Sequence, residues 1–153
     1  MAATRTATVT WNGTLAEGSG TVTAGSSELF TELPVSWASR TEAPSGMTSP
    51  EELLAAAHAS CFSMALSGAL ARSGTAPDHL HVSATVTFDK VGDGWSVTRS
   101  EIDVVGVVTG LDEAGFDEAA RNAGTGCPIS RALAGNVEIV VSSTLEDEQH
   151  EGG

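Results

Sequence analysis

The stretch over residues 50–72 constrains the fold most, because it is apolar or small on nearly every face of a helix. It reads "PEELLAAAHASCFSMALSGALAR". Ser49 precedes Pro50, and Glu52 follows Ser49 by three positions, which is the pattern of a capping box with proline at the first helical position. Gly74, just beyond the stretch, is a suitable C-terminal cap. A helix with this composition must be buried on most of its faces, so we expect it to be the central helix of a core.

The rest of the chain alternates between strand and helix patterns. Residues 4–11 alternate in period two before the Asn12-Gly13 turn signal, which predicts a β-hairpin. Arg40 is expected to open a loop that is rich in Pro, Gly and Ser. The remaining expected elements are a short strand at 33–39, two long strands joined at "GDG" within 79–108, a helix at 111–124, a helical turn at 128–135 and a last strand at 136–144. Together these elements predict an α+β fold in which antiparallel sheets pack around the central buried helix.

Length and repeats suggest one structural unit. A chain of 153 residues lies in the usual single-domain range, and the sequence has no internal repeat or linker. We therefore expect a single domain over residues 1–144. The charged residues 145–153 are expected to form a frayed tail.

The net charge of the chain bears on the partners it can bind, and its N-terminal sequence bears on the cell compartment in which it works. Twenty acidic residues against seven basic ones give a net charge of -13, which repels phosphate backbones and anionic membrane surfaces. We therefore expect neither nucleic acid nor membrane as a partner. His58, several serines and two glutamates make residues 50–72 better suited to a core than to a membrane span. The N-terminal "MAATRTATVTW" alternates like a strand and does not resemble a signal peptide, so we predict a cytoplasmic protein.

The two cysteines lie in contrasting settings. Cys61 falls in the middle of the apolar helix, where a cysteine is usually just a small hydrophobic residue. Cys127 follows glycines and precedes Pro128, so it should lie at a helix N-terminus, where the dipole favours a thiolate. One rigid cysteine and one on a hinge-like segment is the arrangement expected of a peroxidatic and a resolving thiol, although an inert Cys61 remains an alternative.

A family resemblance joins these features. The run "SPEELLAAAHASCFSMALSGAL", the later "GCPISRAL" and the upstream Ser39-Arg40 resemble the OsmC/Ohr family of thiol peroxidases, and within it the osmotically inducible OsmC branch. The resemblance implies an OsmC-like fold and an intertwined homodimer. It also makes Cys61 the peroxidatic residue and Cys127 the resolving residue, with Arg40 and Glu51 as the polar pair that orders the site.

The function implied by this resemblance is an antioxidant hydroperoxide reductase for oxidative or osmotic stress defence. Cys61 would attack organic hydroperoxides or hydrogen peroxide and become a sulfenic acid, which Cys127 would convert to a disulfide. Arg40 would stabilise the thiolate, and Glu51 would hold the guanidinium. An external dithiol would reopen the disulfide, with lipoyl-type compounds among the candidates. The chemistry requires no cofactor and no metal.

Other interpretations of the same residues stay open at this point. Arg40 is also explained as a surface charge, and Glu51 as a favourable charge in the first helical turn. His58, three positions before Cys61, could tune the thiol or be a packed, hydrogen-bonded core residue. A noncatalytic small-molecule-binding domain on the same fold is an alternative function. So is a metal-binding domain, whose ligands would be drawn from Cys61, Cys127, His58, His79 and His81.

Helix geometry bears on assembly. On one continuous helix Glu51 and Cys61 would lie ten positions apart, or about 15 Å along the axis. A guanidinium next to Cys61 would then need a glutamate from a second copy of the chain, or Arg40 would have to span the gap. We therefore expect a two-fold symmetric homodimer with two equivalent sites near the interface.

Overall fold

The computed structural model describes residues 1–147. Its contacts divide the chain into two compact units, Met1–Leu53 and Leu54–Gly153. The single domain over residues 1–144 stays a prediction. Of the expected tail at 145–153, Leu145 is the last residue of a strand, and residues 148–153 lie outside the described part of the chain.

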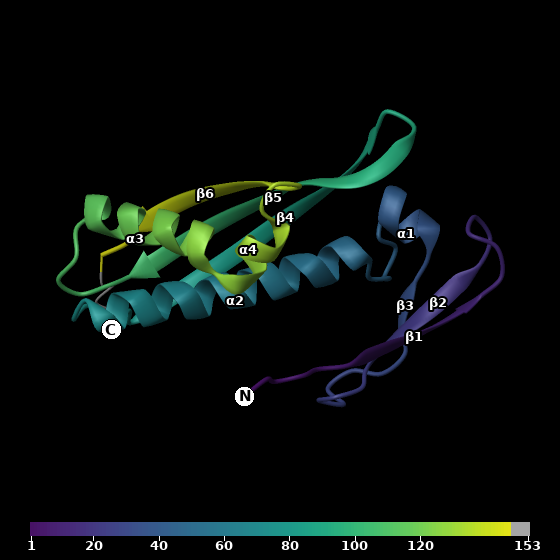
Figure 1. Cartoon of the computed structure of the whole chain (residues 1–153), viewed down its shortest axis with the longest axis horizontal. Coiled ribbons are helices and arrows are strands. Elements are labelled where there is room, and N and C mark those ends of the chain that lie inside the picture. Colours follow the sequence, from purple (N-terminus) through teal and green to yellow (C-terminus); the bar gives the residue numbers. More distant parts are fainter. Residues whose placement is uncertain (148–153) are drawn as a thin grey trace, which may run out of the picture. The chain divides into compact units, whose positions relative to one another are not determined.

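Ten helices and strands make up the described chain (Figure 1), in the order β1 Ala7–Asn12, β2 Ser19–Ala24, β3 Leu33–Val35, α1 Trp37–Thr41, α2 Pro50–Arg72, β4 His79–Val91, β5 Gly94–Val107, α3 Glu113–Gly126, α4 Pro128–Leu133 and β6 Glu138–Leu145. The predicted α+β class is confirmed. So is the predicted extent of the long helix.

The first unit contains a small antiparallel sheet in the order β1-β2-β3. The predicted hairpin is confirmed, with Asn12 paired to Ser19 across the loop. The strand expected over 33–39 ends at Val35, so that prediction is wrong beyond this residue. Ser36 and Ser39 form a reciprocal capping box there, which starts α1. Arg40 consequently lies on a helix and not in a loop.

The long helix α2 begins as its sequence indicated. The backbone N–H of Glu52 donates to Ser49 Oγ over 3.1 Å, as expected for an N-cap serine. The carboxylate of Glu52 accepts a hydrogen bond from the hydroxyl of Thr48 over 2.7 Å. By length and composition α2 could also cross a membrane, a test that core helices of soluble proteins pass as well.

The second unit is built on a sheet in the order β4-β5-β6. β4 and β5 are antiparallel and joined at Val91 and Gly94, as the "GDG" turn predicted. β6, however, runs parallel to β5, where an antiparallel sheet was expected. The reason is the connection: α3 and α4 lie between the two strands in sequence and carry the chain back before β6 begins, as parallel pairing requires.

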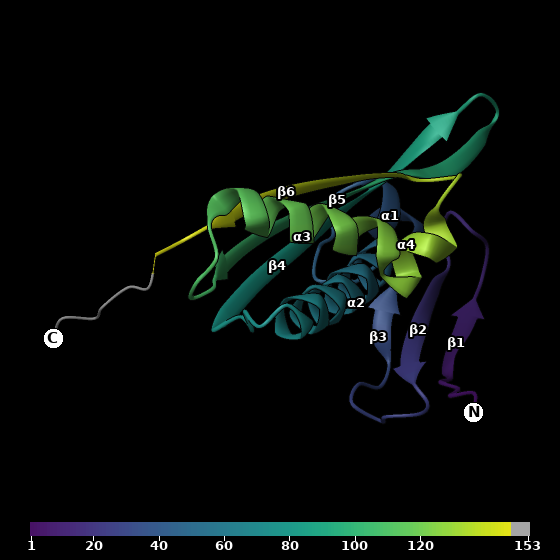
Figure 2. The same cartoon turned by 60° about the vertical axis from the view of Figure 1, so that its left-hand side comes forward.

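The core of this unit lies between the sheet and helices on one of its faces. Figure 2 shows α2 and α3 on the same side of β4, β5 and β6. The fully or nearly fully buried core side chains come from α2, β5 and α3, and include Phe62, Leu66, Leu70, Ile102, Val104, Phe116 and Ala120. The cysteine-bearing helix thus contributes to the core, but the expectation that it is buried on most of its faces is wrong for the described chain. Its buried residues form a single stripe, while Met64 on another face is 74% exposed.

Candidate active site

Cys127 lies at the junction between two helices. It is the C-cap of α3 and the N-cap of α4, and Pro128 is the first residue of α4, as the sequence predicted. The Sγ of Cys127 accepts a hydrogen bond from the backbone N–H of Ser130 over 3.3 Å. The side chain is fully buried. A sulfur in this position takes the place of the usual capping oxygen and faces the positive end of the helix.

Cys61 lies on α2 next to Cys127. Both thiols are free, Cys61 is half-buried, and it packs against the buried cluster that contains Cys127. Burial raises the pKa of the Cys61 thiol, and the neighbouring Cys127 raises it further, whereas the backbone N–H of Ile129 and the positive charge of Arg131 lower it. The net effect is a raised pKa of Cys61, so the surroundings that this unit provides favour its neutral thiol.

His58 lies at the centre of a buried hydrogen-bonded network. Its Nδ1 is 2.6 Å from Ser100 Oγ on β5, and its Nε2 is 2.8 Å from Ser130 Oγ on α4. The Oγ of Ser130 is in turn 3.1 Å from Cys127 Sγ. His58 is fully buried, which lowers the pKa of its ring. The expectation of a packed, hydrogen-bonded histidine is confirmed, and the cysteine it is linked to is Cys127.

Arg40 and Glu51 form an ion pair in the first unit. The Nε of Arg40 donates to both carboxylate oxygens of Glu51 over 2.9 and 3.1 Å, and its Nη2 lies 2.8 Å from Oε1. Glu51 is only 8% exposed, and the guanidinium also lies 5.8 Å from the ring centroid of Trp37. A buried carboxylate with several charge-assisted hydrogen bonds holds the guanidinium in one orientation.

The two predicted pairs thus belong to different units of the chain. Arg40 and Glu51 lie in the first unit, and Cys61 and Cys127 lie in the second. Arg40 and Glu51 form an ion pair within their unit, and Cys61 packs against the buried cluster that contains Cys127 within the other.

A largely apolar pocket borders Arg40. This pocket lies in the first unit and has a volume of about 330 Å³. A separate pocket of about 390 Å³ lies in the second unit. The lining residues of the first-unit pocket are Val9, Trp11, Leu15, Val22, Val35, Ser36, Trp37, Arg40, Pro50 and Leu53. This composition, apolar walls with one cation, suits a ligand that has an apolar body and a polar end.

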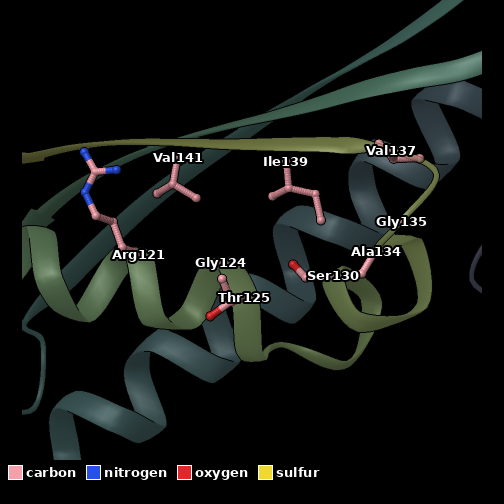
Figure 3. Close-up of a pocket in the computed structure, with 9 residues that line it drawn as sticks. All are labelled: Arg121, Gly124, Thr125, Ser130, Ala134, Gly135, Val137, Ile139 and Val141. Atoms are coloured by element: carbon pink, nitrogen blue, oxygen red, sulfur yellow. The ribbon is translucent and has the colours of Figure 1, made fainter.

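The second-unit pocket lies between β6 and the helices α3 and α4 (Figure 3). Ile139 and Val141 line it from β6, Val137 lines it from just before β6, and Ser130 borders it from α4. Arg121 also lines this pocket and forms an ion pair with Asp117 on the same helix over 2.7 Å.

Three residues around the cysteines were not singled out from the sequence. Ser130 and Arg131 follow Cys127 closely in "GCPISRAL". Ser130 is the third helical residue after the capping Cys127, a position whose backbone N–H usually bonds the capping side chain, so its contact with Cys127 could have been predicted. Ser100 lies on the same face of β5 as Ile102 and Val104, so strand alternation alone would have placed it in the core without revealing its partner.

The histidines proposed as metal ligands lie in different surroundings. His79 and His81 are exposed on β4, whereas both ring nitrogens of the buried His58 contact serines. Within residues 1–147 no group of three His, Cys, Asp or Glu side chains is placed to hold a metal ion.

Comparison with known proteins places this geometry in a family. The OsmC-like protein family model matches residues 43–142. The chain is 38% identical to peroxiredoxin OsmC of Escherichia coli K12, over 84% of this chain and 89% of that protein. It is 26% identical to an organic hydroperoxide resistance protein of Xanthomonas axonopodis pv. citri, over 62% of this chain and 66% of that one.

Solved structures agree with this match. The organic hydroperoxide resistance protein OhrB of Bacillus subtilis superposes with a TM-score of 0.68 at 26% identity, covering 91% of this chain and 98% of that one. An organic hydroperoxide resistance protein OsmC of Legionella pneumophila has the same fold, with a TM-score of 0.69 at 22% identity, covering 94% and 99%. The chain therefore belongs to the OsmC-like protein family.

Proposed function

We propose that this protein is a cysteine-based, dithiol-dependent peroxidase that reduces organic hydroperoxides and hydrogen peroxide. The observation that carries the proposal is the proximity of two free thiols, Cys61 and Cys127, with Cys127 at a helix N-terminus. The names of the relatives, peroxiredoxin OsmC and organic hydroperoxide resistance protein, support a peroxidase-type function.

The proposed cycle has three steps. The thiolate of Cys61 attacks one peroxide oxygen, the O–O bond breaks, and alcohol or water leaves while Cys61 becomes a sulfenic acid. Cys127 then attacks the sulfur of Cys61, and water leaves as the disulfide forms. An external dithiol reduces this disulfide by two exchange steps and is itself oxidised, which returns both thiols.

The Arg40–Glu51 pair supplies what the surroundings of Cys61 lack. Burial and the neighbouring Cys127 raise the pKa of the Cys61 thiol, so the reactive thiolate requires a further cation when peroxide binds. Arg40 is the cation that we assign to this role, because its guanidinium is already oriented by Glu51. A guanidinium is also a suitable hydrogen-bond donor to peroxide oxygens.

The pocket beside Arg40 favours organic peroxides as substrates. Its walls are formed by Val, Leu, Trp and Pro side chains, with Arg40 as its charged residue. An alkyl or aryl group would bury apolar surface there while the peroxide group remains near the guanidinium. Hydrogen peroxide has no such group, so we expect a higher KM for it.

We further propose that the active form is a two-fold homodimer. Large apolar side chains remain exposed in both units, including Val9 and Leu15 at about 60% and Met64 at 74%. β1 is exposed along its whole length, and only one stripe of α2 is buried. A second copy of the chain would cover these surfaces and would bring the Arg40–Glu51 pair of one chain to Cys61 of the other.

The test of this function measures peroxide consumption by the purified protein with and without a dithiol. We expect turnover of an alkyl hydroperoxide only with a dithiol such as dihydrolipoamide, and no turnover by Cys61→Ser. Sedimentation at micromolar concentration should give a dimer. Dithiol-independent turnover, or full activity of Cys61→Ser, would contradict the proposed cycle, and an active monomer would contradict the proposed assembly.

A further inference from the structure

A continuous hydrogen-bonded chain of side chains leads away from Cys127. It runs from Cys127 Sγ to Ser130 Oγ over 3.1 Å, from Ser130 Oγ to His58 Nε2 over 2.8 Å, and from His58 Nδ1 to Ser100 Oγ over 2.6 Å. All four side chains are at most 1% exposed. They come from the α3–α4 junction, α4, α2 and β5, so the fold brings together residues that are far apart in sequence.

The burial of Cys127 separates its thiol from bulk water. A thiol attacks a sulfenic acid or a disulfide as the thiolate, so Cys127 must lose its proton before it can react. Because its side chain is fully buried, bulk water does not accept that proton directly. The polar side chain that contacts its sulfur is Ser130, and the base that Ser130 contacts is His58.

We infer that His58 is the general base for Cys127 and acts through the hydroxyl of Ser130, with Ser100 fixing the orientation of the imidazole ring. This inference rests on the proposed function, because it concerns the disulfide-forming step. Ser130 and Ser100 are positioning residues. His58 likewise acts on Cys127 without touching it.

The hydrogen bonds of this chain are satisfied before and after proton transfer. In the arrangement that we assign to the reduced protein, the thiol of Cys127 donates to Ser130 Oγ, the hydroxyl of Ser130 donates to His58 Nε2, and Nδ1–H donates to Ser100 Oγ. After transfer the hydroxyl of Ser130 donates to the thiolate, and the protonated Nε2 donates to Ser130 Oγ. The backbone N–H of Ser130, 3.3 Å from Cys127 Sγ, also stabilises the thiolate.

Burial lowers the pKa of His58, which keeps the ring neutral and its Nε2 lone pair available as an acceptor. The cationic ring formed during the step is therefore short-lived. This property suits a base that must release its proton in every cycle.

The chemical step balances as follows. The proton of Cys127 passes to Ser130 as the hydroxyl proton of Ser130 passes to His58. The thiolate of Cys127 attacks the sulfur of Cys61, the S–O bond of the sulfenic acid breaks with its electron pair on oxygen, and the leaving hydroxide takes one proton to become water. The proton gained by His58 makes up for the proton that the hydroxide takes, so the ring is neutral again at the end of the step. The sum is one sulfenic acid and one thiol converted to one disulfide and one water.

The test uses a dipyridyl disulfide as the probe, because its reaction does not depend on peroxide. Cys61 attacks the probe and releases a first thiopyridone, and Cys127 then attacks the resulting mixed disulfide and releases a second. The two phases of absorbance report the two thiols separately. We expect Ser130→Ala and His58→Gln to slow the second phase by about 100-fold, the contribution usual for a general base.

A pair of variants of equal shape separates the hydroxyl from the packing. Ser130→Thr and Ser130→Val add the same bulk, but only threonine keeps a hydroxyl, so we expect Ser130→Thr to retain a second phase within about threefold of wild type and Ser130→Val to lose it. Ser63→Ala is the control for loss of a serine hydroxyl near Cys61, since Ser63 bonds only the carbonyl of Ala59 in its own helix.

Two results would overturn the inference. One is equal slowing by Ser130→Thr and Ser130→Val, which would make the role of Ser130 one of packing. The other is a wild-type second phase in both His58→Gln and His58→Asn, which would show that Ser130 passes the proton elsewhere. If the wild-type protein shows both phases but consumes no peroxide, the proposed peroxidase function fails while the assignment of His58 stands.

Discussion

Arg40 binds both carboxylate oxygens of Glu51 within its own chain, through contacts of 2.8 to 3.1 Å. This finding resolves one question left open by the sequence, namely whether the glutamate that orders the guanidinium has to come from a second copy. It does not, because the pair is complete in one chain. In the proposed dimer, mixing chains would therefore separate the pair from Cys61 but would not separate Arg40 from Glu51.

The first prediction follows from this pairing. Arg40→Ala and Cys61→Ser chains, each nearly inactive alone, should regain activity when they are unfolded together and refolded as mixed dimers. Half of the dimers would then be mixed, and one of the two sites in each would be complete, so about a quarter of the wild-type sites should be active. Stopped-flow oxidation of Cys61 by an alkyl hydroperoxide measures this fraction.

The matched control for this mixture is Arg40→Ala with Glu51→Ala. Since both residues of the pair belong to one chain, no mixed dimer contains an intact pair, and this mixture should stay inactive. If neither mixture recovers although mixed dimers form, the pair serves Cys61 of its own chain instead.

The second prediction concerns the loss of Cys127. Cys127→Ser should react once with peroxide and then, at excess peroxide, accumulate a sulfinic acid at Cys61, because no thiol closes the disulfide. The wild-type protein should resist this overoxidation. Mass spectrometry of the peptide containing Cys61 distinguishes the two. Multiple turnover by Cys127→Ser with the same dithiol would show that Cys127 is not required for resolution.

The third prediction concerns the pKa of Cys61. Arg131 lowers this pKa and Cys127 raises it, so Arg131→Ala should shift the pKa upward and Cys127→Ala should shift it downward. The pH dependence of Cys61 alkylation by iodoacetamide, measured on its own peptide, should move to higher pH in the first variant and to lower pH in the second. A shift of the same sign in both would contradict the assigned causes.

The fourth prediction concerns stability and pH. Burial lowers the pKa of His58 below its ordinary value of 6.5, so below pH 6.5 the unfolded chain binds more protons at this residue than the folded chain does. The contribution of His58 is fully present above pH 6.5 and is lost as the pH falls toward the folded-state pKa. The free energy of unfolding in urea should therefore decrease over this range. His58→Gln should reduce the slope.

The fifth prediction tests the packing of α3 on β6. A Cβ at Gly124 would lie 2.5 Å from Val141 Cγ2, so Gly124→Ala should lower the free energy of unfolding by about 1–3 kcal/mol. Val141→Ala in the same chain should recover part of this loss. Gly126 near the end of the same helix has nothing within 4 Å of its added Cβ. Urea unfolding of Gly126→Ala should show stability equal to or above wild type.

Local sequence signals predicted much of this fold. Ser49 and Pro50 set the start of α2, the "GDG" turn joined β4 to β5, and Pro128 after Cys127 marked a helix start. Each of these signals acts within a few residues. The strand expected through 33–39 was wrong beyond Val35 because the Ser36–Ser39 capping box is equally local but was overlooked.

Local sequence signals do not predict contacts between residues that are far apart in the sequence. The sequence did not reveal that His58 contacts Ser100 and Ser130, because those partners lie 42 and 72 positions away. The parallel pairing of β6 was missed for the same reason, since alternation identifies a strand but not its neighbour or direction. The Arg40–Glu51 pair was named only through family resemblance, and its contact within one chain comes from the structure.

The parallel pairing of β6 with β5 has a consequence for the order of events during synthesis. Cys127 lies in the crossover between these two strands, and the crossover is completed only when β6, the last strand, has joined the sheet. Chains grow from the N-terminus, so Cys61 leaves the ribosome well before the segment that holds its partner thiol in place. A newly made chain therefore passes through a period in which Cys61 is present without Cys127 in position.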